Sequence, residues 1–192
     1  MSSNPFSTKF IRPGAIAYQC DPGKSMAYYA DCFLSNGRRG QVVGPHGTGK
    51  STFVIAFQKE LAARGLDVHL ITLHSFDKSE LNNLLTLQPG SILILDGFEQ
   101  LPFWRRFKII HSTLWRHIGL LTTSHVSFGL PTLLETSVDL ETAKNLVRTL
   151  TGSEPSENLE SLLTKHNGNL REVFFDLYDE HEGISGNDHR KA

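Results

Sequence analysis

Short runs of apolar residues alternate along this chain with longer segments whose apolar residues recur at helical spacing. The third run, Ser91-Ile92-Leu93-Ile94-Leu95-Asp96, is apolar throughout and ends in an acid. A strand that is apolar on both faces belongs in the middle of a parallel sheet, because helices cover both of its sides. We expect strands over residues 41–43, 66–73, 91–96, 119–125 and 132–136.

Helices are predicted between these strands and after the last of them. Phe53, Phe57 and Leu61 illustrate the pattern, since they share one face and Gly65 follows where a helix stops. The helices are expected over residues 25–35, 52–64, 77–87, 100–118, 140–150, 156–166 and 170–178. Strands alternating with helices predict an α/β fold with a parallel five-stranded sheet.

The pattern divides the chain into an N-terminal arm with a helix at 1–37, a core at 38–137, a helical lid at 138–183 and a tail at 184–192. The polar tail is expected to be disordered. Two interpretations of the arm stay open: it crosses a nucleotide site with Phe10 or Ile11 near the adenine, or it packs on the sheet edge.

A glycine-rich loop follows the first strand and fits the pattern G-x-x-x-x-G-K-[ST] at every fixed position. Glycines let the backbone wrap a phosphate chain, and the following helix N-terminus adds free N–H groups and a positive dipole end. The residues expected to bind the nucleotide are Gly44, Pro45, His46, Gly47, Thr48, Gly49, Lys50, Ser51 and Thr52. Lys50 is expected to reach the β and γ phosphates and Ser51 to bind Mg²⁺ through its hydroxyl.

Polar side chains end two of the predicted strands, where ligands of parallel sheets bind. Asp96 is the expected second ligand of Mg²⁺. Glu99 is the candidate that orients or deprotonates the attacking water, although an acid at a surface helix start is an equal interpretation. Thr123 or Ser124 is expected to bond the phosphate or the water.

A basic stretch separates the acidic parts of the chain, with no Asp or Glu from Gln100 to Leu134. The helix from Trp104 to Arg116 could therefore contact nucleic acid or an acidic partner. We favour a solvated helix in which both tryptophans are packed.

Composition adds bounds. The 192 residues carry a net charge of −1 and 39% hydrophobic residues, as in an ordinary globular protein, with no global attraction to nucleic acid or membrane. The two cysteines lack a C-x-x-C spacing, and no signal peptide or long apolar run is visible. We expect a cytoplasmic protein.

These motifs resemble the AAA+ and STAND class of P-loop ATPases over residues 38–180. Gly44 to Ser51 match the Walker A motif, Asp96 matches the Walker B aspartate, and Ser124 or Thr123 falls at sensor 1. Gly168-Asn169-Leu170-Arg171 resembles sensor 2, in which the arginine reaches the γ-phosphate. The resemblance implies a three-layer sandwich with strand order 5-1-4-3-2, ATP with Mg²⁺ as ligands, and a lid that closes over the nucleotide.

Two departures from that class matter. Gly97 follows Asp96 where most members have glutamate, so either Glu99 substitutes or hydrolysis is slow. The segment from Ser124 to Thr132 contains no arginine. His125 stands in this interval, where the class carries its trans-acting arginine, so a stand-alone ATPase or STAND-like switch fits better than a ring.

The sequence thus predicts an ATP-binding, Mg-dependent ATPase module that acts as a switch. One alternative is a small-molecule or nucleotide kinase, although no clear set of lid arginines is visible. Another is a non-catalytic scaffold that binds DNA or protein through Trp104 to Arg116. A GTPase is disfavoured because no N-K-x-D motif occurs, and an ABC ATPase because no L-S-G-G-Q-like sequence precedes Asp96.

Overall fold

The computed structural model describes residues 4–73 and 86–183. The helix expected over 77–87 lies outside these residues except for its last two positions, and so does the expected disordered tail. Contacts divide the chain into two compact units. The helical unit comprises Met1–Gln19, Pro45–Gly49 and Ser137–Ala192, and the core unit comprises Cys20–Gly44 and Lys50–Thr136.

The core unit is built on a parallel five-stranded sheet in the order β2-β3-β4-β1-β5. This order confirms the expected 5-1-4-3-2 arrangement. The third strand is buried along its whole length, as its unbroken apolar run predicts. The strands are β1 (Arg39–Val43), β2 (Val68–Thr72), β3 (Ile92–Asp96), β4 (Gly119–Ser124) and β5 (Thr132–Glu135).

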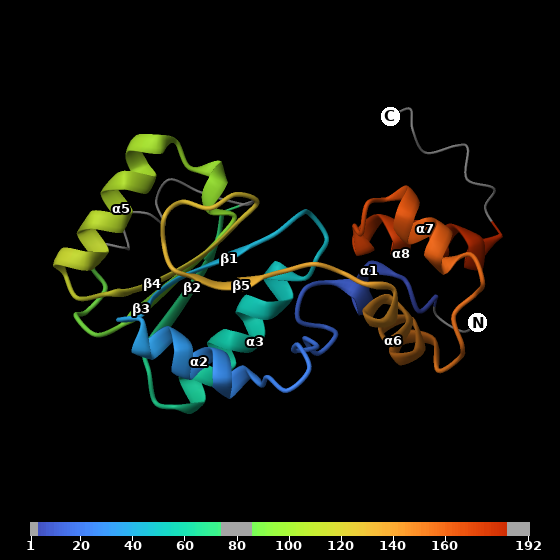
Figure 1. The fold of residues 1–192 in the computed structure, drawn as a ribbon, viewed down its shortest axis with the longest axis horizontal. Helices are drawn as coiled ribbons and strands as arrows, with labels where there is room; N and C mark the ends of the chain where they lie inside the picture. Colours follow the sequence, from blue (N-terminus) through green and yellow to red (C-terminus); the bar gives the residue numbers. More distant parts are fainter. Residues whose placement is uncertain (1–3, 74–85, 184–192) are drawn as a thin grey trace. The chain divides into compact units, whose positions relative to one another are not determined.

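Helices cover both faces of this sheet, which confirms the three-layer α/β sandwich (Figure 1). On one face lie α2 (Met26–Ser35) and α3 (Lys50–Ala63), and on the other lies α5 (Phe103–Trp115). A short 3-10 helix, η3 (Phe98–Gln100), connects β3 to α5.

Aromatic side chains join α2 to α3. Tyr29 meets Phe53 edge to face at 5.4 Å between ring centroids, and Phe33 meets Phe57 in the same way at 5.6 Å. All four rings are fully buried or nearly so. Because α3 begins at the predicted glycine loop, this packing fixes the helix that Lys50 starts.

Helix α5 differs from expectation on its outer side. Trp104 is 60% exposed and Trp115 is 82% exposed, so the prediction that both tryptophans are packed is wrong. The side of α5 that faces the sheet is held by Ile109 and Thr113, which are both buried. Ile109 and Thr113 make the buried contact between α5 and the sheet, and the tryptophans lie on the exposed side of the helix.

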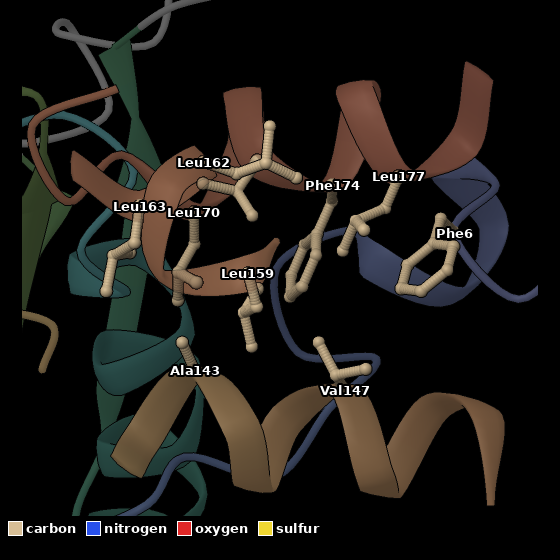
Figure 2. Packing of buried hydrophobic residues seen from close by; sticks show 10 residues of the cluster. Phe6, Ala143, Val147, Leu159, Leu162, Leu163, Leu170, Phe174 and Leu177 are labelled. Atoms are coloured by element: carbon tan, nitrogen blue, oxygen red, sulfur yellow. The ribbon is translucent and has the colours of Figure 1, made fainter. Parts of the chain in front are cut away.

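The helical unit contains α1 (Thr8–Ile11), α6 (Leu140–Thr151), α7 (Leu159–Lys165) and α8 (Leu170–Glu182). Asp139 caps α6 by accepting a hydrogen bond from the Thr142 N–H at 2.8 Å, as its sequence position predicts. The helices share one apolar cluster. Figure 2 shows its members, which include Ala143, Val147, Leu159, Leu162, Leu163, Leu170, Phe174 and Leu177.

The first residues of the N-terminal arm belong to this cluster. Phe6 is buried and stacks on Phe174 at 6.0 Å between ring centroids, and Ile11 packs against the same residues. Asn4 extends the contact, since its side-chain amide donates to the Tyr178 carbonyl oxygen at 3.1 Å. The arm therefore helps to form the core of the helical unit.

We expect Phe6→Ala to destabilise the helical unit by about 3 kcal/mol, because the change removes a buried ring and leaves a cavity. Chemical denaturation followed by circular dichroism measures this loss. Phe10→Ala, at a half-buried position in the same arm, is the matched control and should cost less than about 1 kcal/mol. Equal costs for the two variants would contradict this packing.

Candidate functional site

Three neighbouring strands of the core unit bring their carboxyl ends together. Strand β4 lies between β3 and β1, and Val43 pairs with Ser124 at the end of the ladder. Asp96 ends β3 at the same edge of the sheet. Thr123 and Ser124, the polar residues at the end of β4, therefore lie beside the strand that leads into the glycine loop.

The chain leaves the sheet at Gly44, where only glycine fits. The Gly44 N–H donates to the Ser124 carbonyl oxygen at 3.2 Å. A Cβ at this position would lie 2.2 Å from Oγ1 of Thr136 and 2.5 Å from its carbonyl oxygen. The first glycine of the motif is thus required by close packing against the segment that follows β5.

The tip of the loop, Pro45–Gly49, groups with the helical unit. Gly47 and Gly49 have φ values of 70° and 91°, a left-handed conformation that favours glycine. A Cβ on Gly47 would overlap Oδ1 of Asn169, the residue that caps α8. Thr48 Oγ1 donates to the Pro45 carbonyl oxygen at 2.9 Å, which closes the turn.

Lys50 begins α3 in the core unit and is 9% exposed. Its ammonium donates to the Gly44 carbonyl oxygen at 2.6 Å. Burial lowers the pKa of Lys50, and the negative charges of Glu99 and Asp96 act in the opposite direction. The two carboxylates thus favour the charged form of the lysine, whereas its removal from water disfavours that form. Ser51 and Thr52 follow in the first turn, both half-buried.

Asp96 is buried, and its carboxylate is held by Thr123. The Thr123 hydroxyl donates to Asp96 Oδ1 at 2.5 Å and accepts from the Gly97 N–H at 2.9 Å. Gly97 has a φ of 87°, which turns the chain directly after the strand. One hydroxyl therefore fixes both the carboxylate and the turn that follows it.

Glu99 lies in η3 and faces His125, which follows β4. Glu99 Oε1 is 3.1 Å from His125 Nε2, and the other imidazole nitrogen, Nδ1, is 3.0 Å from the Gly44 carbonyl oxygen. The same Nδ1 lies 3.3 Å from the Lys50 ammonium. Glu99 Oε2 is buried and has no hydrogen-bond partner among the described residues. A buried carboxylate oxygen without a partner indicates a site that accepts a donor or a cation.

The core unit brings four of the predicted residues together: Gly44, Lys50, Asp96 and Glu99. Arg171 is exposed in the first turn of α8, which belongs to the helical unit. Ser124 reaches the same edge, but its hydroxyl donates to the Val126 carbonyl oxygen at 2.7 Å. In this structure that hydroxyl is directed at its own loop.

Two contacts at this site are not predicted from the sequence. His125, which the resemblance places where the class carries its arginine, contacts both Glu99 and Gly44 at the start of the loop. Thr136 packs against Gly44 from the end of β5. The signal for His125 was its position one residue past Ser124, at the end of a strand that adjoins the loop strand.

The residues present fit a magnesium ion bound together with phosphates. No group of three or more His, Cys, Asp or Glu able to hold a metal occurs in the described ranges 4–73 and 86–183. Mg²⁺ usually binds through one or two carboxylates, with waters and substrate phosphates completing its shell. The buried Asp96 carboxylate and the Ser51 hydroxyl, at the start of α3, are residues of that kind.

We expect Thr123→Val to destabilise the core unit by about 1–3 kcal/mol, because it leaves the Asp96 carboxylate and the Gly97 N–H unpaired in a buried site. Urea denaturation measures the change. Thr123→Ser is the matched control, since it keeps the hydroxyl and should retain most of the stability. A valine variant as stable as the serine variant would show that the hydroxyl does not hold Asp96.

Comparison with known proteins supports the fold. The sequence matches no protein-family profile and no curated protein. Two structures of replication initiators, DnaA bound to AMPPCP and single-stranded DNA and a DNA replication initiation factor, superpose with TM-scores of 0.61 and 0.59. Both are 18% identical to this chain and cover 89% and 88% of it.

The Holliday junction branch migration motor RuvB of Thermotoga maritima superposes with a TM-score of 0.51 at 15% identity, covering 85% of this chain and 70% of its own. This chain spans 64% of each of the two initiator structures. None of the helices in the described ranges has the length and apolar character needed to cross a bilayer. DnaA and RuvB are both AAA+ ATPases. The chain therefore has the fold of the AAA+ class of P-loop ATPases.

Proposed function

We propose that this protein binds ATP with Mg²⁺ and hydrolyses it slowly, and that the nucleotide state sets the position of the helical unit. The observation that carries the proposal is the buried Lys50 ammonium at the edge of the sheet, flanked by Asp96 and Glu99. The fold of AAA+ ATPases and the AMPPCP bound to DnaA are consistent with it.

The glycine loop and Lys50 bind the triphosphate. In the present structure Lys50 donates to the Gly44 carbonyl oxygen, so binding requires the ammonium to turn toward the β and γ phosphates. The phosphates replace the water that Lys50 has lost, which offsets the cost of its burial. Main-chain N–H groups at the start of α3 add to this binding.

The metal site consists of the Ser51 hydroxyl and the Asp96 carboxylate. When bound there, Mg²⁺ would supply positive charge that stabilises the transition state of phosphoryl transfer. Thr123 keeps the Asp96 carboxylate in place through its 2.5 Å hydrogen bond. It acts as a positioning residue because its hydroxyl is already occupied by Asp96 and Gly97.

Glu99 is the proposed general base. It accepts a proton from the attacking water while the new oxygen–phosphorus bond forms and the bond to the β-phosphate oxygen breaks. His125 orients Glu99 through Nε2 at 3.1 Å, so the acid that stands three residues after Asp96 is held despite its displacement from the usual position. This arrangement supports Glu99 over the interpretation that it is only a surface helix start.

The helical unit is the proposed lid. Asn169 lies against Gly47 of the loop, and both belong to that unit. Arg171 follows two residues later and is the proposed contact to the γ-phosphate. Loss of the γ-phosphate on hydrolysis removes that contact, which couples nucleotide state to lid position.

Lys50→Ala should weaken ATP binding by about 2–4 kcal/mol, or roughly 30- to 1,000-fold, because the phosphates lose their charged partner. Isothermal titration calorimetry measures the affinity. Lys59→Ala removes an exposed lysine from the same helix and should leave the affinity unchanged. If both variants bind ATP like the parent chain, the loop does not hold the phosphates.

Glu99→Gln should keep the ATP affinity within a few-fold and lower the turnover number by roughly 100-fold or more, because glutamine cannot accept the proton of the water. Steady-state phosphate release and a separate binding titration distinguish the two effects. His125→Ala should lower turnover to a smaller extent than Glu99→Gln. Normal turnover by the glutamine variant would assign the base to another residue.

A further inference from the structure

Helix α5 carries an exposed apolar face that the nucleotide site does not use. Five large apolar side chains on this helix are between 55% and 82% exposed. They are Phe103, Trp104, Phe107, Leu114 and Trp115. Soluble monomers rarely expose a connected apolar patch above roughly 300–600 Å², and larger patches mark interaction sites.

The five side chains form one continuous face. At about 100° per residue, Phe103, Phe107 and Leu114 fall within about 40° of one another around the helix axis. Trp104 and Trp115 form an adjacent row with His111, whose ring lies 3.9 Å from that of Phe107. Ile109 and Thr113 are buried on the opposite side. This face, which we term the α5 face, therefore points away from the sheet.

The cations of α5 lie largely off this face. Arg106 lies over the Phe128 ring at 4.3 Å, and Arg116 donates to the Leu87 carbonyl oxygen at 2.7 Å. Both are half-buried, and so is Arg105, which stacks on Trp104 at 4.8 Å. Of these three arginines and Lys108, only the lysine is exposed. The basic character read from the sequence is thus turned mainly toward the core unit, and the α5 face is apolar.

We propose that the α5 face is the interface of a symmetric dimer, in which α5 of one copy packs antiparallel on α5 of a second copy. A two-fold axis that crosses the α5 face at the level of residue 109 places Phe103 against Leu114 of the partner copy on one flank. It places Trp104 against Trp115 of the partner copy on the other flank. Next to the axis, Phe107 of each copy faces His111 of the other. Such an isologous interface needs a self-complementary patch, and this face is one.

The area is sufficient for a dimer. With about 150–250 Å² for each large side chain, the five exposed fractions amount to roughly 650 Å² per copy. Complete coverage of this area in both copies would bury about 1,300 Å², which reaches the lower end of the range of stable interfaces. The antiparallel arrangement also opposes the two helix dipoles. The proposal does not depend on nucleotide binding, because none of these residues belongs to the site described above.

Sedimentation velocity on the full chain, over about 1–100 µM, tests the interface directly. We expect a monomer–dimer equilibrium that Phe107→Glu weakens roughly 30-fold or more, because a carboxylate then enters the apolar contact on each side of the two-fold axis. Trp115→Ser should weaken it as well, and its position is too exposed for the change to disturb folding. Phe175→Glu, at an exposed phenylalanine on α8, is the matched control and should leave the dimer intact.

Cross-linking tests the arrangement of the two helices. With Cys20 and Cys32 replaced by serine, a mixture of Phe107→Cys and His111→Cys chains should form a disulfide-linked heterodimer under mild oxidation, because the two-fold axis places each of these positions opposite the other. Phe175→Cys in the same background should stay monomeric. A parent chain that is monomeric at about 100 µM, or a Phe107→Glu variant that dimerises normally, would overturn the proposal.

The salt dependence of binding distinguishes a second copy of the chain from nucleic acid as the partner of the α5 face. Added salt should preserve or tighten the dimer, since it screens the two Lys108 ammonium groups on the same flank. Binding of a fluorescent oligothymidine to the α5 face would weaken steeply with salt. If the chain is monomeric and Trp104→Ser abolishes oligothymidine binding, the face serves nucleic acid and the dimer is rejected.

Discussion

Burial of the Lys50 ammonium is the constraint on which the candidate site depends. The lysine stands at the first position of α3, so it cannot move away from the sheet edge without unwinding a helix that Phe53 and Phe57 anchor. Its charge is tolerated there because the Gly44 carbonyl oxygen accepts a hydrogen bond and two carboxylates lie nearby. A triphosphate would give the ammonium further acceptors, and a bound Mg²⁺ would offset the negative charge of the two carboxylates and the phosphates.

The strand order explains why these groups meet. Because β4 lies between β1 and β3, Thr123 can reach Asp96 on one side while Ser124 pairs with Val43 on the other. His125 comes next and connects Glu99 to the Gly44 carbonyl oxygen. A different strand order would separate Asp96 and Glu99 from the glycine loop, although each sequence motif would remain unchanged. Topology therefore does as much as the motifs to create the site.

Much of this was predictable from the sequence. The buried run ending at Asp96 and the glycine loop each required one local structure, and the strand order came with the resemblance that they carried. The side-chain contacts were not predictable, because they depend on how distant segments pack. Nothing in the sequence indicates that the Ser124 hydroxyl donates to Val126, or that Thr136 lies against Gly44. The prediction that the tryptophans of α5 are packed was wrong for a related reason. Ile109 and Thr113 already make the buried contact of α5 with the sheet, and the tryptophans remain exposed.

The proposed function depends on a triphosphate and its metal ion binding at Lys50 and Asp96. A calorimetric titration of the unmodified chain with AMPPCP, with and without Mg²⁺, tests it most directly. We expect saturable binding of one nucleotide per chain, with an affinity that falls when Mg²⁺ is removed. Absence of saturable binding in the presence of Mg²⁺, at nucleotide concentrations up to about 1 mM, would contradict it.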